Sequence, residues 1–509
     1  MNKLDVATLK DKINGCWEGK NMGGVLGAPF EMYRGLVDVD FYTQDLSKGV
    51  PPNDDLDLQL IWLNACEKWG KAIDADILAE YWLCYETGNC SEYGIAKQNL
   101  TWGLKPPFSG VVGNHFKDSN GAFIRSEIWA CLFPGNPDQA VRYAYEDAIV
   151  DHTGEGVYAQ TFCAALESAA FFESDVNVLI DIGLSYLPKD CAVYSAICMV
   201  REMYNEGKTV EEIRTKLLTD YPSYFGIFRS HPWEVEEQFP LGDNLGFDAP
   251  VQLGIVTAAL LFGQGDFEKT IITAVHCGED ADCTAATAGA IIGLIKGESG
   301  LPDKWKKPLG HKIETMFINK TLCLPIPATT DELTERVIRL LPVFNDASHL
   351  VIEDGSFVIY KNEQQLNDDR DAYFKGNYGN EPMKICDLLK LSPYKKLYKN
   401  AIFNAIVDYG REPFVKVGEQ VKLTLSLINQ NLGHTKYCIC LKTMVDDGVE
   451  LNTQKYTREM VSNSYETQTD IDVVFTVKEE IKPYVDIYLD ITVEGRPVNE
   501  VIKCRYFFK

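Results

Sequence analysis

Apolar residues recur at helical spacing along most of the first 345 positions of this chain. Leu56, Leu60 and Leu63 follow one another at intervals of four and three, which is the spacing of one helix face. The same spacing predicts further helices over residues 75–86, 137–149, 192–204, 210–218, 251–262 and 267–276. Sustained alternation of apolar and polar residues is almost missing before residue 310, so the sequence predicts an all-α domain.

The pattern changes after about residue 345. Residues 350–360 form two short apolar runs around Asp354 and Gly355, a pair that is typical of a tight hairpin turn. From residue 416 onward apolar and polar residues alternate, which predicts strands over residues 421–427, 471–477, 485–493 and 501–508. These strands indicate a β-sandwich of the immunoglobulin-like kind. We therefore expect a helical domain over 1–345, a connecting segment with a β-hairpin over 346–404, and an all-β domain over 405–509.

Four glycines near the N-terminus, Gly15, Gly19, Gly23 and Gly27, recur every four residues and form one stripe on a predicted helix. Each glycine destabilises a helix by about 1 kcal/mol relative to alanine. Such a stripe is favourable only if another helix or a ligand packs closely against it. Glu31 follows in the loop after this helix, where a solvated carboxylate is the simpler interpretation of the segment taken alone.

Two acidic groups each stand at the start of another helix. Asp280 and Asp282 precede or begin a run of very small residues, and Asn53, Asp54 and Asp55 begin an apolar helix. Carboxylates are favoured at helix N-termini, so an acidic cap is the simple interpretation of each group. If the two helices lie side by side, these carboxylates converge and repel one another unless cations or protons neutralise them. Oxygen ligands without a Cys/His set favour magnesium or manganese over zinc.

Two further segments carry polar residues of interest. Ser119, Asn120 and Gly121 form a turn whose backbone amides could face an anion, although most such turns are only turns. His152 precedes a helix of small residues, where a histidine is more often a structural hydrogen-bonding group than a catalyst.

Composition restricts the class of partner. The net charge is −25, which excludes a broad surface for a nucleic-acid backbone. No apolar run is long enough to cross a bilayer, and the N-terminal residues lack a secretory signal, so we expect a cytoplasmic protein without membrane association. The fifteen cysteines contain no C-x-x-C pair and are expected to be reduced thiols.

Five stretches together resemble one family. In chain order they are GCWEGKNMGGVLGAPFE, NDDLDLQL, SNGAFIR, DHTGEGVYAQ and GEDADCTAATAGAIIG. This order is similar to that of the ADP-ribosylglycohydrolases, the family of the dinitrogenase-reductase-activating glycohydrolases. The resemblance does not extend over residues 345–509, which would be an additional domain.

The resemblance implies an all-α fold with a binuclear magnesium centre, with manganese as the alternative ion. It implies hydrolysis of the glycosidic bond between ADP-ribose and a protein side chain or small molecule, by attack of water at the anomeric carbon of the distal ribose. By position, the metal ligands would be Asn53, Asp54, Asp55, Asp280, Asp282 and Cys283. The catalytic residues would be Glu31, Asp55 and Asp282, and the substrate-binding residues would be Ser119, Asn120, Gly121 and His152.

The chain departs from the family's motifs at three positions. Asn53 stands where the family has Thr or Ser, Cys283 where it has Thr, and Gly24 where Asp is common. Two other functions stay open: hydrolysis of a different ribosyl or nucleoside-like glycoside, and a ligand-binding or structural role without catalysis. The β-sandwich could be a structural lid, an oligomerisation surface or a docking surface for a substrate protein. The linkage cleaved and the oligomeric state are not predicted.

Overall fold

The computed structural model describes residues 2–221, 247–361, 389, 392–400, 402–429, 437–461 and 468–509. Its contacts divide the chain into two units, Met1–Thr101 with Ser109–Gln365 and Trp102–Phe108 with Leu366–Lys509. Most of the predicted connecting segment, 346–404, lies outside the described residues, although its hairpin lies within them. The two units are described separately below.

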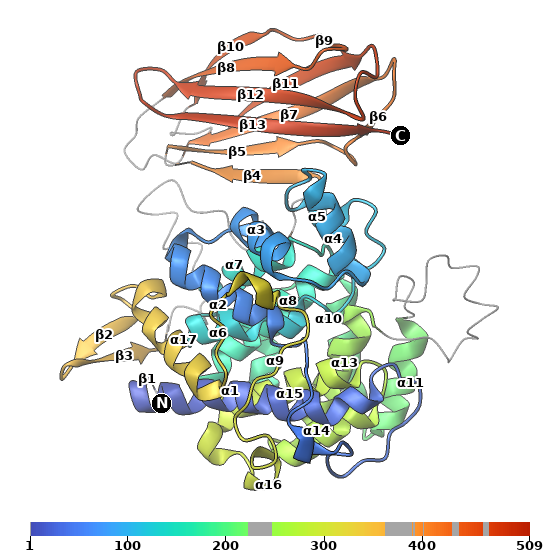
Figure 1. Cartoon of the computed structure of the whole chain (residues 1–509), viewed down its shortest axis with the longest axis vertical. Helices are drawn as coiled ribbons and strands as arrows, with labels where there is room; N and C mark the ends of the chain where they lie inside the picture. The colour runs from blue at the N-terminus through green and yellow to red at the C-terminus, as the bar shows by residue number, and fades with distance from the viewer. Residues whose placement is uncertain are drawn as a thin grey trace. The chain divides into compact units, whose positions relative to one another are not determined.

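Helices make up most of the first unit (Figure 1). In chain order they are α1 (Val6–Gly27), α2 (Asp57–Trp69), α3 (Ala75–Tyr85), α4 (Ser91–Thr101), α5 (Phe108–Val111), α6 (Glu127–Leu132), α7 (Pro137–Ala148), α8 (Glu155–Ala170), α9 (Val176–Leu184), α10 (Ala192–Asn205), α11 (Val210–Asp220), α13 (Ala249–Gly263), α14 (Phe267–His276), α15 (Ala281–Lys296), α16 (Asp303–Lys306) and α17 (Thr330–Phe344). The helices predicted from apolar spacing are confirmed, with small shifts at their ends. Among the described residues, no helix combines the length and apolarity needed to cross a bilayer.

A small antiparallel sheet completes this unit. The predicted hairpin is confirmed as β2 (Leu350–Glu353) and β3 (Ser356–Tyr360), and Asp354 and Gly355 have the positive φ angles of its turn. The sequence did not predict β1 (Lys3–Asp5), which pairs with β3 to give the order β1-β3-β2. A strand of three residues is too short to show alternation.

The glycine stripe of α1 packs against the small-residue face of α15, and the two helices lie side by side in Figure 1. A β-carbon built on Gly15 would lie 2.5 Å from the carbonyl oxygen of Gly293. One on Gly19 would lie 2.7 Å from the carbonyl carbon of Gly289. The partners step by four residues in opposite directions, so the helices are antiparallel and almost in backbone contact. The predicted close approach of a helix is therefore confirmed.

The described residues of the second unit form two five-stranded sheets. Its strands are β4 (Lys395–Lys399), β5 (Phe403–Asp408), β6 (Phe414–Val415), β7 (Gln420–Asn429), β8 (Tyr437–Val445), β9 (Val449–Leu451), β10 (Tyr456–Val461), β11 (Gln468–Val477), β12 (Tyr484–Val493) and β13 (Asn499–Phe508). The sheet orders are β10-β8-β12-β13-β6 and β4-β5-β7-β11-β9. Alternate residues of β7, β11 and β12 are buried, as the alternation in the sequence predicted. A β-rich region thus follows the helical one.

Candidate functional site

The antiparallel contact between α1 and α15 brings the C-terminal end of α1 to the N-terminal end of α15. A β-carbon on Gly27 would lie 2.5 Å from the Cα of Asp282. After α1, the backbone amide of Met32 donates to the carbonyl oxygen of Glu279 at 2.7 Å, and the amide of Glu279 donates to the carbonyl oxygen of Tyr33 at 2.8 Å. The loop that carries Glu31 is thereby fixed beside the turn that leads into α15.

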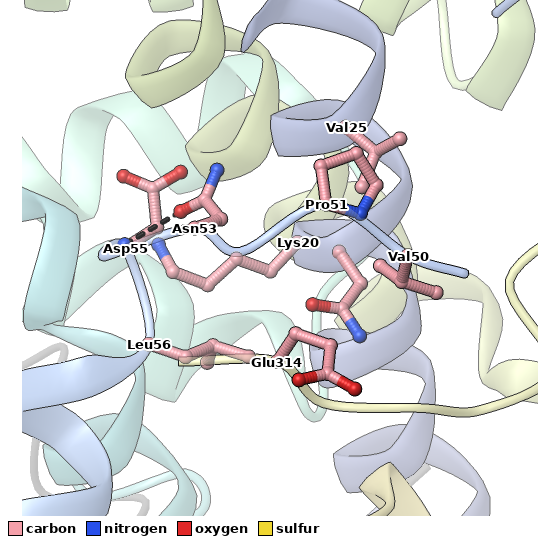
Figure 2. Close-up of a pocket in the computed structure, with 9 residues that line it drawn as sticks. Lys20, Val25, Val50, Pro51, Asn53, Asp55, Leu56 and Glu314 are labelled. Carbon is pink, nitrogen blue, oxygen red and sulfur yellow. Dashed lines mark hydrogen bonds between the residues drawn. The ribbon is translucent and has the colours of Figure 1, made fainter. Parts of the chain in front are cut away.

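A short turn before α2 supplies the second acidic group. The side-chain oxygen of Asn53 accepts a hydrogen bond from the amide of Asp55 at 2.6 Å, shown as a dashed line in Figure 2. Such a turn is a common use of asparagine before a helix. Asp57, one turn further on, accepts the amides of Met316 at 2.9 Å and Phe317 at 2.5 Å. Asn53 and Asp57 therefore shape and anchor this segment, and the role of Asn53 as a metal ligand stays a prediction.

Five of the predicted residues fall into two clusters that share one carboxylate. In the first, the ligand atoms of Glu31, Asp280 and Asp282 lie within 4.8 Å of one another. In the second, those of Asp55, Asp282 and Cys283 lie equally close. Asp282 belongs to both, so the predicted convergence of the two acidic groups is present in the structure.

Several carboxylate oxygens in these clusters have no hydrogen-bond partner among the residues that the structure describes. They are Asp55 Oδ2, Asp280 Oδ1 and Asp282 Oδ1, on side chains that are only 3–5% exposed. A buried polar atom without a partner is strongly unfavourable, and a buried charge more so. Bound divalent cations would remove both penalties, and the oxygen ligands suit them. The residues therefore fit the metal centre that the resemblance implied.

The pKa values of Asp282 and Glu31 are raised because several carboxylates lie close together in a buried place. Burial, and then the charges of Asp280 and Asp55, raise the pKa of Asp282 well above its ordinary value. Burial, followed by the charges of Asp280 and Asp55, raises the pKa of Glu31 to about 7. Glu31 lies at the exposed edge of the clusters, so its carboxyl group can exchange protons with solvent near neutral pH.

A buried ion pair lies behind Asp55. Lys20 Nζ donates to Glu127 Oε1 at 2.8 Å, and neither side chain is more than 1% exposed. Burial alone would lower the pKa of Lys20, but the charges of Glu127 and Asp55 outweigh it and raise that pKa. Gln59 of α2 donates to the other oxygen of Glu127 at 2.8 Å. Lys20 thus supplies a fixed positive charge to the acidic centre.

The turn formed by Ser119, Asn120 and Gly121 contacts the acidic clusters through Asn120. The side-chain amide of Asn120 donates to Asp280 Oδ2. The backbone amides of Ser119 and Asn120 are occupied by the carbonyl oxygens of Phe116 and Phe247. These two amides are therefore already paired within the chain, which weighs against the idea that they face an anion. A β-carbon on Gly121 would meet the carboxylate of Glu92, so that side chain would have to shift to admit a larger residue.

His152 contacts the turn formed by residues 119–121 through the side chain of Ser119. Its Nε2 lies 3.0 Å from Ser119 Oγ, and its Nδ1 lies 2.8 Å from Asp151 Oδ1. Arg125 contacts the same Asp151 at 2.5 Å. His152 has no exposed surface. It positions Ser119 in this structure, and a direct contact with substrate stays a prediction.

A pocket opens beside Asp55 (Figure 2). Its volume is about 290 Å³ when its open mouth is included, and its lining residues are Lys20, Asn21, Val25, Val50, Pro51, Asn53, Asp55, Leu56 and Glu314. Of the residues in the two clusters, Asp55 lines this pocket, which therefore gives an approach to that carboxylate.

Sequence reasoning did not identify the groups that support the centre. Asp54 was predicted as a ligand, but it joins neither cluster among the described residues. Lys20 and Glu127 were missed, because they lie in different helices and only the fold pairs them. Asp151 could have been noticed, since it directly precedes His152 in the sequence.

The family model described as ADP-ribosylglycohydrolase matches residues 5–341, which is more than half of the chain. Among solved structures, a chain titled "ADP-ribosylglycohydrolase-related protein complex" is similar at 18% identity and a TM-score of 0.45, covering 66% of this chain and 99% of that chain. No curated protein matches.

Proposed function

This chain belongs to the ADP-ribosylglycohydrolase family over residues 5–341, and on that premise we propose that it is a metal-dependent hydrolase that releases ADP-ribose from a modified group. The modified group is a protein side chain or a small molecule. The observation that carries the proposal is the set of buried carboxylate oxygens on Asp55, Asp280 and Asp282 that have no hydrogen-bond partner within the described ranges. These oxygens lie within the segment that matches the family.

The ligands for two divalent cations would be Asp55, Asp280, Asp282, Glu31 and Cys283, from the two clusters that share Asp282. When bound, the cations would supply positive charge that orders the vicinal hydroxyls of a ribose and stabilises negative charge. Asn120 holds Asp280 in place through its side-chain amide. Lys20 supplies a further positive charge behind Asp55.

The protein residues would then carry the proton. Water attacks the anomeric carbon of the distal ribose, and the bond from that carbon to nitrogen or oxygen of the modified group breaks. Glu31, which lies at the exposed edge of the clusters, can accept a proton from the water and donate one to the leaving group. The products are free ADP-ribose and the restored side chain or small molecule.

The test is to replace Asp282 by Asn, which removes the carboxylate common to both clusters with little change in volume. We expect no release of ADP-ribose, with an unchanged circular dichroism spectrum. Asp266→Asn is the matched control, because Asp266 also stands at a helix N-terminus but caps α14. Full activity of Asp282→Asn would contradict the proposal, and so would equal losses in both variants.

We also propose that the β-rich unit is an immunoglobulin-like sandwich that serves as an additional domain. What supports this is the strand order: β5, β7, β11 and β9 lie together in one sheet, and β10, β8, β12 and β13 in the other. The positions of β5, β7 and β11 correspond to strands A, B and E of that fold, and those of β8, β12 and β13 to strands C, F and G. The rings of Phe475 in β11 and Tyr506 in β13 contact one another at 5.3 Å between centroids, which joins the two sheets.

A further inference from the structure

The two clusters that share Asp282 differ in their chemistry. Glu31, Asp280 and Asp282 offer only carboxylate oxygens. Asp55, Asp282 and Cys283 offer two carboxylates and one sulfur. Hard cations such as Mg²⁺ and Mn²⁺ prefer oxygen ligands, whereas thiolates favour softer ions of the Zn²⁺ class. One centre therefore presents two sub-sites with different ligand preferences.

The sulfur of Cys283 is directed into the centre. Cys283 Sγ lies 3.4 Å from Asp55 Oδ1 and donates to it. The adjacent residue, Asp282, begins the same first turn of α15, so both side chains face Asp55 from one helix. The sulfur therefore occupies a position in which a cation between Asp55 and Asp282 would contact it.

A second observation concerns the carboxylate oxygens of this cluster. Within the described part of the chain, Asp55 Oδ2 and Asp282 Oδ1 have no hydrogen-bond partner, although their side chains are only 3% and 5% exposed. The side-chain oxygen of Asn53, in the turn before α2, accepts the backbone amide of Asp55. Cys283 supplies the third ligand atom of this cluster, beside these two carboxylates. Three protein ligands with one open position are typical of a catalytic zinc site.

We propose that the centre is divided, so that Glu31, Asp280 and Asp282 hold a hard cation while Asp55, Asp282 and Cys283 hold a thiophilic cation of the Zn²⁺ class. The proposal deepens the proposed function, since it assigns the ions of the same site. It concerns metal binding and does not require that a particular linkage is cleaved.

The test uses the full chain after treatment with a chelator, titrated with Cd²⁺ and, separately, with Co²⁺. A thiolate bound to either ion produces a charge-transfer absorption that oxygen ligands do not produce. We expect this absorption in the unmodified protein and its loss in Cys283→Thr and Cys283→Ser. Cys198→Ser is the matched control, because Cys198 is also half-buried but lies in α10, in neither cluster. That variant should keep the absorption.

Calorimetry gives a second measurement. A supporting second-sphere group alone contributes about tenfold to metal affinity, so loss of a direct ligand in Cys283→Thr should weaken Zn²⁺ binding by at least about tenfold. Mn²⁺ binding at the all-oxygen cluster should change much less. If Cys283→Thr does not fold, Asp55→Asn tests the same sub-site while it keeps the thiol, and it should also weaken the absorption.

Two results would overturn the division: an absorption of equal strength in the Cys283 variants, or its absence in the unmodified protein. Failure of the proposed function is separate, because it is measured with substrate. An absorption that depends on Cys283, without release of ADP-ribose from any linkage, would remove the function and keep the division. Release of ADP-ribose without such an absorption would keep the proposed function and remove the division of the centre.

Discussion

Replacing Gly19 by alanine tests whether the backbone contact between α1 and α15 sets the position of the site. A β-carbon at this position would lie 2.7 Å from the carbonyl carbon of Gly289, and still nearer to its oxygen. Restoring an ordinary contact of 3.4 Å therefore requires the two backbones to separate by at least 0.7 Å. Neither partner is a side chain that can rotate away.

The magnitude follows from two opposed effects. Alanine is more favourable than glycine inside a helix by about 1 kcal/mol. Overpacking of a close-packed interior costs about 1–3 kcal/mol, and a clash between two backbones belongs at the upper end of that range. We therefore expect Gly19→Ala to lower the free energy of unfolding of the helical unit by about 2 kcal/mol.

Denaturant unfolding followed by the circular dichroism of the helices measures this change. Gly300→Ala is the control, because Gly300 is exposed and an added β-carbon there meets only the Lys296 side chain, at 3.0 Å. That variant should change stability by a few tenths of a kcal/mol at most. If Gly19→Ala is as stable as the unmodified protein, the backbones of α1 and α15 are not in such close contact.

Three further predictions follow from the polar groups of the site. In metal-free protein, the free energy of unfolding should fall as pH rises above about 4. The reason is that burial raises the pKa of Asp282, so the folded state binds more protons than the unfolded state. The fall should be smaller in Asp282→Asn, and an equal fall would contradict this reasoning. Asn120→Ala should weaken metal binding by about 10–100-fold, because Asn120 orients Asp280, and calorimetry would detect the change. Lys20→Met should destabilise the protein by about 3–5 kcal/mol, because it leaves Glu127 buried without its partner; Lys20→Met combined with Glu127→Leu should recover part of this loss in the same denaturation assay, and no recovery would argue against the pairing.

Much of the fold could be predicted because it depends on local pattern. The spacing of apolar residues predicted both ends of α14 correctly, and the alternation of apolar and polar residues predicted which face of β12 is buried. The glycine stripe of α1 indicated a close partner, but it could not identify α15, since many helices of this chain contain small residues. The strand β1 was missed because three residues are too few to show a period, and its pairing with β3 joins positions more than 350 residues apart.

The sequence predicted the acidic residues of the candidate site, but it did not predict which residues hydrogen-bond to them or neutralise them. Asp280 and Asp282 were recognisable as acids at the start of a helix of small residues. The partner of Asn120 could not be read from the sequence, because a side-chain amide in a turn has many candidate partners before the fold is known. The same holds for Lys20, whose partner Glu127 lies in a helix 107 residues away.

The central claim is tested most directly by measuring release of free ADP-ribose from arginine-, serine- and acetyl-linked ADP-ribose. The full-length protein is assayed with chelator, and then with Mg²⁺, Mn²⁺ or Zn²⁺ added back. The account predicts release from at least one linkage, loss of that release with chelator, and recovery with added cation. Absence of release from every linkage in the presence of bound metal would contradict it and would favour a different glycoside as the substrate.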